Sequence, residues 1–336
     1  MKLKRYSTLM AFALGLAFGV AQAADPIVIK FSHVVAAATP KGKAADYFAK
    51  LAGEKTQGRV KVEVYHNSTL YKDKEEMEAL QMGAVQMLAP SLSKFRPLGV
   101  KEFEVFDLPF LFDDYTELHR VTQGPIGQSL LNKLEPKGVK GLAYWDNGFK
   151  SFSANRPLHD VEDYKGLKMR IQSSKVLDAQ MRALGTIPQV MAFSEVYQAL
   201  QTGVVDGTEN PISNLYTQKM HEVQKHLSLT NHGYLGYGVI TNKKFWDGLP
   251  ADVRGQLEAA MKEATAYANK IAKDENDDAL AAVRKSGKTR IYTPSGGDRK
   301  ALKRALFPVH KEFAPKIDEA LVQSIYKETG FDPAKL

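Results

Sequence analysis

The stretch Ala251–Arg284, ADVRGQLEAAMKEATAYANKIAKDENDDALAAVR, decides the fold. It contains no proline and one glycine, and its apolar residues recur at roughly helical spacing: Val253, Leu257, Met261, Ala264, Ile271, Leu280 and Val283. At 1.5 Å per residue, one helix over this stretch is about 50 Å long, which exceeds the diameter of a domain of about 150 residues. We therefore expect a helix that runs across two lobes. The alternative is two helices with a break near Asp274–Asp278, where acidic residues cluster.

The segments before this helix predict two α/β sets. In the first set, residues 27–31 and 60–64 alternate as strands, Thr39-Pro40 opens a helix, residues 77–82 are helical, and residues 85–89 form a short buried strand. In the second set, residues 167–171 and 188–191 are strands and residues 176–184 are a helix. This order predicts a mostly parallel sheet with helices on both faces.

The amino-terminal segment predicts that the protein is exported, and the composition bears on how it is stabilised. Lys2, Lys4 and Arg5 precede the apolar run Leu9–Val20 and the small-residue pattern Ala21–Ala23, which is typical of a cleavable secretory signal. The run is too short for a membrane anchor, which needs about 20 residues. An exported chain without cysteine has no disulfides, so its stability must come from a large core.

The charge pattern and the motifs exclude several function classes. The formal net charge is +8, but basic and acidic residues are mixed and no aromatic-interleaved basic tract is present, so nucleic acid is not expected as a partner. No P-loop, no Gly-x-Ser-x-Gly elbow and no cysteine nucleophile occurs. In HEVQKH, His221 and His226 are five residues apart, whereas a zinc-binding helix needs four, so neither a metal nor a cofactor is predicted. The glycines of GYLGYG, residues 233–238, indicate a strand that another backbone approaches closely.

The candidate binding residues are cations and aromatic groups at the ends of elements. Arg170 in GLKMRIQSS faces away from the apolar side of its strand, near the carboxyl end, where ligands bind in open α/β sheets. Its planar fork matches a carboxylate. Further candidates follow the first strand, the third strand and the Asn147-Gly148 turn: His33 and Lys41, Lys94, and Trp145 with Lys150. Taken singly, each is equally consistent with a surface charge, a hydrogen-bonded histidine or a core tryptophan.

Three segments together resemble one family. GLKMRIQ (166–172), MAFSEVYQALQTGVVDGTENP (191–211) and EVQKHLSLTNH (222–232) are similar to the extracytoplasmic solute-binding proteins of tripartite ATP-independent periplasmic (TRAP) transporters, of the DctP type. The resemblance covers the mature chain. It implies an α/β fold of two lobes with a hinge and a long helix that spans both, a non-enzymatic function and an organic-anion ligand.

The resemblance also implies roles for individual residues. Arg170 corresponds to the family arginine that grips the ligand carboxylate, Asn210 to the family asparagine of the Glu-Asn-Pro tripeptide, and Phe193 to an aromatic residue that lines the site. The acidic segment before Pro211 is expected to be a loop that presents the Asn210 amide to the same carboxylate.

The substrate class follows from residues that vary within the family. Lys94 and Lys150 stand where sialic-acid-binding members carry arginine, whereas SHVVAAATPKG and WDNGFK are similar to the branch that binds four-carbon dicarboxylates such as succinate, fumarate and malate. A buried dicarboxylate needs cations at both ends. Arg170 and Asn210 are expected at one end, and Lys94, Lys150 and Lys41 at the other, with His33 and Trp145 between them.

The sequence thus predicts a monomeric periplasmic protein that hands a dicarboxylate to the permease of a TRAP transporter. The expected organisation is a signal peptide (1–23), one lobe from 24–147 plus 236–275, and a second lobe from 148–235 plus 276–336. Alternatives are a binder of an aromatic or keto acid, an exported enzyme that acts on carboxylates, and a sensory protein that docks on a receptor.

Overall fold

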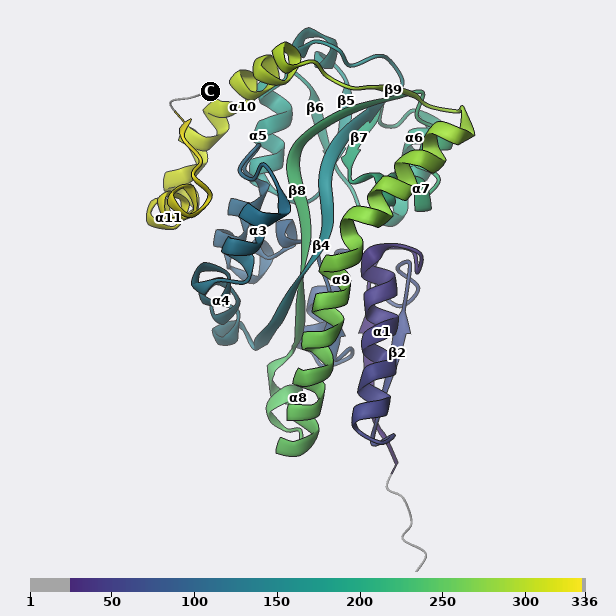
Figure 1. Cartoon of the computed structure of the whole chain (residues 1–336), viewed down its shortest axis with the longest axis vertical. Coiled ribbons are helices and arrows are strands. Elements are labelled where there is room, and N and C mark those ends of the chain that lie inside the picture. Colours follow the sequence, from purple (N-terminus) through teal and green to yellow (C-terminus); the bar gives the residue numbers. More distant parts are fainter. Residues whose placement is uncertain (1–24, 334–336) are drawn as a thin grey trace, which may run out of the picture.

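The structure is a computed structural model that describes residues 25–333, so the predicted signal peptide, residues 1–23, lies outside the described residues. The described chain forms one nine-stranded sheet with helices packed around it (Figure 1). Eight strands follow the order β2-β1-β3-β8-β4-β7-β5-β6, and β9 pairs with β8. The strands are β1 (Ile27–Ser32), β2 (Val60–Tyr65), β3 (Met87–Leu88), β4 (Val139–Ala154), β5 (Lys168–Ile171), β6 (Ile187–Val190), β7 (Gly207–Asn210), β8 (His226–Asn242) and β9 (Arg290–Tyr292).

The helices that the sequence predicts to begin at residues 40, 77, 176 and 251 begin within one residue of these positions. For example, the Thr39 hydroxyl accepts a hydrogen bond from the Gly42 backbone N–H at 3.1 Å, and Pro40 occupies the first helical position. The helices are α1 (Pro40–Lys55), α2 (Glu76–Gln81), α3 (Tyr115–Thr122), α4 (Pro125–Asn132), α5 (Lys175–Ala183), α6 (Val196–Thr202), α7 (Ile212–Thr217), α8 (Lys243–Asp247), α9 (Ala251–Ser286), α10 (Gly296–Ile317) and α11 (Glu319–Thr329). Between residues 25 and 333, no helix combines the length and the apolar composition that crossing a bilayer requires.

Two long strands connect the two predicted α/β sets. We call β1, β2 and β3 the first strand set and β5, β6 and β7 the second strand set. β4 and β8 contain 16 and 17 residues and pair antiparallel along most of their length. β8 joins the first set through Met87 and Leu88, and β4 joins the second set through its last four residues. The pairing is parallel within each set, but the sheet as a whole is mixed, because the chain runs through β4 and β8 in opposite directions.

The segment that ends in Glu-Asn-Pro is a strand, so the prediction of a loop is wrong. Gly207–Asn210 form β7, which pairs antiparallel with β4 and parallel with β5, and all four residues are buried. A Cβ atom on Gly207 would lie 2.3 Å from the Ser153 carbonyl oxygen. The glycine that suggests a loop therefore allows a close strand contact instead.

The long helix is continuous. α9 contains 36 residues and passes the acidic cluster without a break, because Asp274, Asp277 and Asp278 face solvent and Lys273 pairs with Asp277 at 2.5 Å. α9 packs on α1 beside the first set and on α7 beside the second set (Figure 1). The prediction of a helix that runs past both sets is thus confirmed.

The helices that follow β9 return along the other side of the molecule (Figure 1). α10 packs on α5 of the second set, whereas α11 packs on α3, which lies in the range predicted for the first lobe. The predicted lobe boundaries, 24–147 plus 236–275 and 148–235 plus 276–336, stay a prediction.

Candidate functional site

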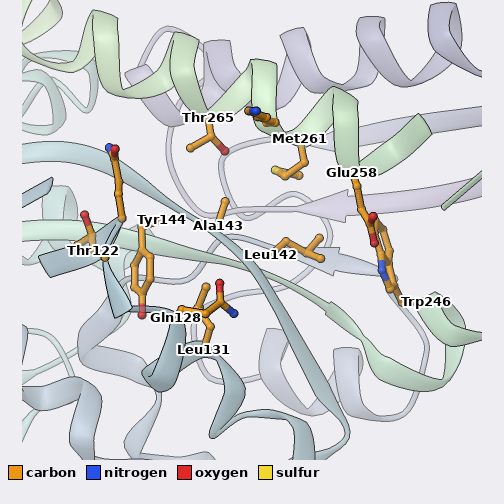
Figure 2. Close-up of a pocket in the computed structure, with 13 residues that line it drawn as sticks. Thr122, Gln128, Leu131, Leu142, Ala143, Tyr144, Trp246, Glu258, Met261 and Thr265 are labelled. Atoms are coloured by element: carbon orange, nitrogen blue, oxygen red, sulfur yellow. The ribbon is translucent and has the colours of Figure 1, made fainter. Parts of the chain in front are cut away.

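Two cavities deserve comparison as candidate sites. The larger, about 290 Å³, lies between α9, α4 and the first half of β4 (Figure 2). The ionisable side chains in its lining, apart from Tyr144, are Glu258 and Lys262, which belong to exposed residues of opposite charge on α9. This cavity therefore lacks a buried cation that would hold an anion.

The smaller cavity, about 180 Å³, lies between the two strand sets and contains buried charges. Asp73 and Lys94 line it from the side of the first set, and Arg170 and Gln172 line it from the second. The Ser91 hydroxyl donates a hydrogen bond to the Gln172 side-chain oxygen across the same gap. Both strand sets contribute charged or polar side chains to the lining of this cavity, which is not true of the larger one.

Arg170 is the central cation of the site. It lies near the carboxyl end of β5 and is 2% exposed, whereas Lys168 on the same face of the strand is exposed. Its Nε and Nη2 donate to the Met191 carbonyl oxygen at 3.2 and 3.0 Å. Among residues 25–333, no carboxylate oxygen lies within 4.0 Å of this guanidinium. Burial lowers the pKa of Arg170 to about 10, so the guanidinium stays charged at neutral pH without a paired anion.

Lys94 brings a second cation to the cavity. It ends a short 3-10 helix (Leu92–Lys94) that follows β3, and its ammonium donates to Asp73 Oδ1. Burial lowers the pKa of Lys94, and the nearby charges of Lys41 and Arg170 lower it further. The Asp73 carboxylate is the ion-pair partner of the Lys94 side chain.

Lys41 does not line the cavity, but it lies close enough to Lys94 for its positive charge to lower the pKa of Lys94. Its ammonium donates to the Ala89 carbonyl oxygen at 2.8 Å and lies 3.7 Å from the centre of the Tyr237 ring. Burial lowers the pKa of Lys41 to about 7 and raises that of its neighbour Glu76 to about 8. The structure thus brings Arg170, Lys94 and Lys41 together, as the sequence suggests.

Phe193 and Asn210 lie on the Arg170 side. The Phe193 ring centre is 5.7 Å from the Arg170 guanidinium carbon. Asn210 lies on β7, two residues after Thr208, which is the register partner of Arg170. Because side chains on a strand alternate, Asn210 shares the face of Thr208. Its amide nitrogen contacts the Thr208 hydroxyl at 3.3 Å and the Met220 sulfur at 4.0 Å, both long for hydrogen bonds.

The remaining predicted residues lie elsewhere. Lys150 forms a buried ion pair with Glu209 at 2.8 Å, and His232 Nε2 lies 2.9 Å from the same carboxylate oxygen. Glu209 therefore already neutralises the positive charge of Lys150. The Trp145 indole donates to the Thr265 hydroxyl at 2.9 Å and packs in the core near α9. We leave both residues out of the candidate site.

His33 is buried, and its Nε2 lies 2.8 Å from Nδ1 of His66. Its ring is close enough to Lys41 for that charge to contribute, after burial, to the low pKa of His33. This placement agrees with the alternative of a hydrogen-bonded structural histidine, and it puts His33 behind the lysines rather than on the cavity wall.

Sequence reasoning did not identify Asp73, Gln172 or the Met191 carbonyl. Asp73 stands in YKDKEE among several charged residues, where nothing in the spacing distinguishes it. Gln172 is within the GLKMRIQ segment, two residues after Arg170, and is the one of the three that strand alternation could have placed on the same face.

Comparisons with known proteins relate this arrangement to one family. Residues 31–316 match the DctP family, described as bacterial extracellular solute-binding protein, family 7. The chain is 64% identical over 320 residues to the C4-dicarboxylate-binding periplasmic protein DctP of Rhodobacter capsulatus, and the match covers 95% of this chain and 96% of that protein.

Solved structures show the same architecture. A TRAP periplasmic solute-binding protein from Shewanella oneidensis with bound succinate has a TM-score of 0.88 and 42% identity, and covers 90% of this chain and 99% of its own. A TRAP periplasmic solute-binding protein from Pseudomonas aeruginosa with bound L-malate has a TM-score of 0.83 and 47% identity, and covers 85% of this chain and all of its own. The predicted two-lobed α/β fold is confirmed by these matches.

The buried Glu209 carboxylate yields a prediction about stability. Although burial raises the pKa of Glu209, the Lys150 ammonium and the hydrogen bond from His232 outweigh it and lower the pKa to about 2. Glu209→Gln leaves Lys150 buried without an anion, so we expect a loss of about 3–5 kcal/mol in the free energy of unfolding at pH 7. Urea denaturation measures this loss.

The pH dependence of that loss has a definite sign. A carboxyl group whose pKa is lower in the folded state stabilises the fold above its unfolded pKa, about 4.3, and loses this contribution as the pH falls toward 2. The difference between wild type and variant should therefore shrink from pH 7 to pH 3. Glu162→Gln, which removes an exposed pair with Lys165, is the control and should cost under about 1 kcal/mol. An equal difference at both pH values would contradict the assignment.

Proposed function

We propose that this chain, which belongs to the DctP family of TRAP solute-binding proteins, captures a small dicarboxylate of the succinate, fumarate or malate type. The observation that carries this proposal is the buried, charged Arg170 guanidinium, which has no carboxylate partner in the described chain and faces a cavity that also holds Lys94.

A dicarboxylate matches the distribution of charge around the cavity. Arg170 uses one edge of its fork for the Met191 carbonyl, and its remaining N–H donors are available to one ligand carboxylate. Lys94 gives Asp73 one of its three donors and keeps the others for a second carboxylate. Burying a carboxylate is costly unless it is paired, so an anion with two ends uses both cations.

The size of the cavity supports a small ligand. Its volume of about 180 Å³ is below the roughly 300–1,000 Å³ of sites for drug-sized molecules. Phe193 and Asn210 lie on the Arg170 side but outside the cavity lining. In the proposed complex the Asn210 amide, on the same face of β7 as Thr208, supplies a neutral donor to the carboxylate that Arg170 binds. Lys94 binds the second carboxylate of the ligand, and Lys41 lies near it outside the cavity lining. The sequence also suggested Lys150 for this second carboxylate.

Delivery to a membrane permease completes the proposed role. The family is one of extracellular solute-binding proteins, and the signal-like residues 1–23 support export to the periplasm. In the proposed cycle the protein binds its ligand as a monomer, closes on it and releases it unchanged to the permease of a TRAP transporter. No step of this cycle requires a cofactor or a chemical reaction.

Isothermal titration calorimetry tests the proposed ligand. Succinate, fumarate and L-malate should each bind, and saturation at about 100 times the dissociation constant should add roughly 2.7 kcal/mol to the free energy of unfolding. Benzoate and pyruvate serve as comparison ligands. Tighter binding of either would favour an aromatic or keto acid as the ligand, and chemical turnover of a bound acid, seen by mass balance, would indicate an enzyme.

Replacing Arg170 tests whether its planar guanidinium holds a ligand carboxylate. Arg170→Lys keeps a positive charge but removes the planar fork, so we expect weaker succinate binding by about 1–3 kcal/mol. Arg182→Lys, at an exposed arginine of α5 that pairs with Asp178, is the matched control and should leave the dissociation constant unchanged. If Arg170→Lys also leaves it unchanged, Arg170 does not hold the ligand.

The affinity should fall as the pH rises from 6.5 to 9. Lys41, whose pKa is about 7, loses its positive charge in this range, and Glu76, whose pKa is about 8, gains a negative one. Both changes disfavour a bound anion, while succinate itself stays ionised throughout. Calorimetry at three pH values measures the trend, and Glu76→Gln should reduce its slope. A dissociation constant that does not vary with pH would refute this linkage.

A further inference from the structure

We propose that Asp73 is a closure latch, a positioning residue that connects the two strand sets beside the ligand and slows its release. This inference rests on the proposed function, because it concerns the same cavity. Asp73 lies in the connection between β2 and α2, and its side chain is 9% exposed. The two oxygens of this one carboxylate bind groups on opposite sides of the cavity.

The first contact lies within the side of the first strand set. Oδ1 accepts a hydrogen bond from the Lys94 ammonium. Asp73 and Lys94 both border strands of the first set, so this bond stays intact when the two sets move apart. It holds the carboxylate in place and leaves Oδ2 to point toward the second set.

The second contact crosses the cavity. Oδ2 accepts a hydrogen bond from the Phe193 backbone N–H at 2.6 Å, 120 residues along the chain. Phe193 follows β6 and opens the segment that leads into α6. A hydrogen bond to an ionised carboxylate is about twice as strong as a neutral one, and burial strengthens it further. Opening of the cavity must break this bond.

The segment that Asp73 holds also positions Arg170. The Met191 carbonyl accepts both guanidinium hydrogen bonds, and the Phe193 ring lies against the guanidinium. When the sets close, Asp73 therefore fixes residues 191–193, and these fix the fork of Arg170. Asp73 acts on the ligand through this segment rather than as an anion that touches it.

The same interface contains a natural control. Lys72, next to Asp73, reaches Glu195 across the gap at 3.7 Å, but both side chains are about half exposed. An exposed ion pair of this kind contributes little, whereas the buried contact of Asp73 is shielded from water. The two contacts thus separate the effect of a buried latch from that of any charge at the interface.

Stopped-flow measurement of succinate binding and release tests the latch. A bond that forms only after closure affects dissociation more than association. Asp73→Ala should raise the dissociation rate at least about tenfold and change the association rate less than about threefold. Asp73→Asn, whose amide oxygen can still accept from Phe193, should have an intermediate effect, and Lys72→Ala should change both rates less than twofold.

Two outcomes would overturn the proposal. Dissociation from Asp73→Ala at the wild-type rate would show that the contact does not hold the closed form. Tighter binding by the variant would show instead that Asp73 competes with the ligand for Lys94. If Asp73→Ala fails to fold, Asp73→Asn decides between the same outcomes.

The test separates failure of the latch from failure of the proposed function. If wild type binds none of the dicarboxylates, the proposed function fails, and small-angle scattering of the ligand-free proteins then decides the latch. A larger radius of gyration for Asp73→Ala than for wild type and Lys72→Ala supports it. Equal radii for all three refute it.

Discussion

The candidate site is organised around the Arg170 guanidinium, which is buried between the two strand sets and has no carboxylate oxygen within 4.0 Å among residues 25–333. Burial lowers the pKa of Arg170 to about 10 and the charges of Glu209 and Glu195 oppose that shift, so the guanidinium stays charged at neutral pH. A buried charge without a partner is costly, so under the proposed function the cavity favours an anion that pairs with this guanidinium. Under that proposal, ligand affinity and closure have the same electrostatic cause.

The lysines show that burial alone does not make a binding residue. Lys150 is as deeply buried as Arg170, but Glu209 accepts its charge and His232 completes the hydrogen bonding. Lys94 is intermediate, because Asp73 pairs with it and Lys41 and Arg170 repel it. Whether a buried cation serves stability or binding thus depends on whether the protein supplies its counter-ion.

Few of the described elements connect the two strand sets, which is the arrangement that the proposed closure needs. β4 and β8 cross side by side, and α9 runs past both (Figure 1). At the crossing, the Asn147 side chain donates to Asn214 and Tyr237 at 2.9 and 2.6 Å, and Asn276 of α9 donates to the Asn147 carbonyl at 2.7 Å. This hydrogen-bonded centre ties β4 and β8 to α7 and α9 where the long strands cross between the two sets.

The sequence by itself predicted the strands and helices of the two α/β sets and the long helix, because hydrophobic periodicity and caps are local along the chain. A local motif also singled out Arg170 as a candidate binding residue. The sequence also predicted that Arg170, Lys94 and Lys41 lie in one region, since carboxyl ends of parallel strands meet at one edge, and the structure places them near one another. Only the tertiary structure decided that Gly207–Asn210 is a strand, that Glu209 neutralises Lys150, that Trp145 is a core residue and that Asp73 spans the cavity. Each of these depends on groups far apart in sequence, and charge pairing between such groups leaves no spacing pattern in the chain.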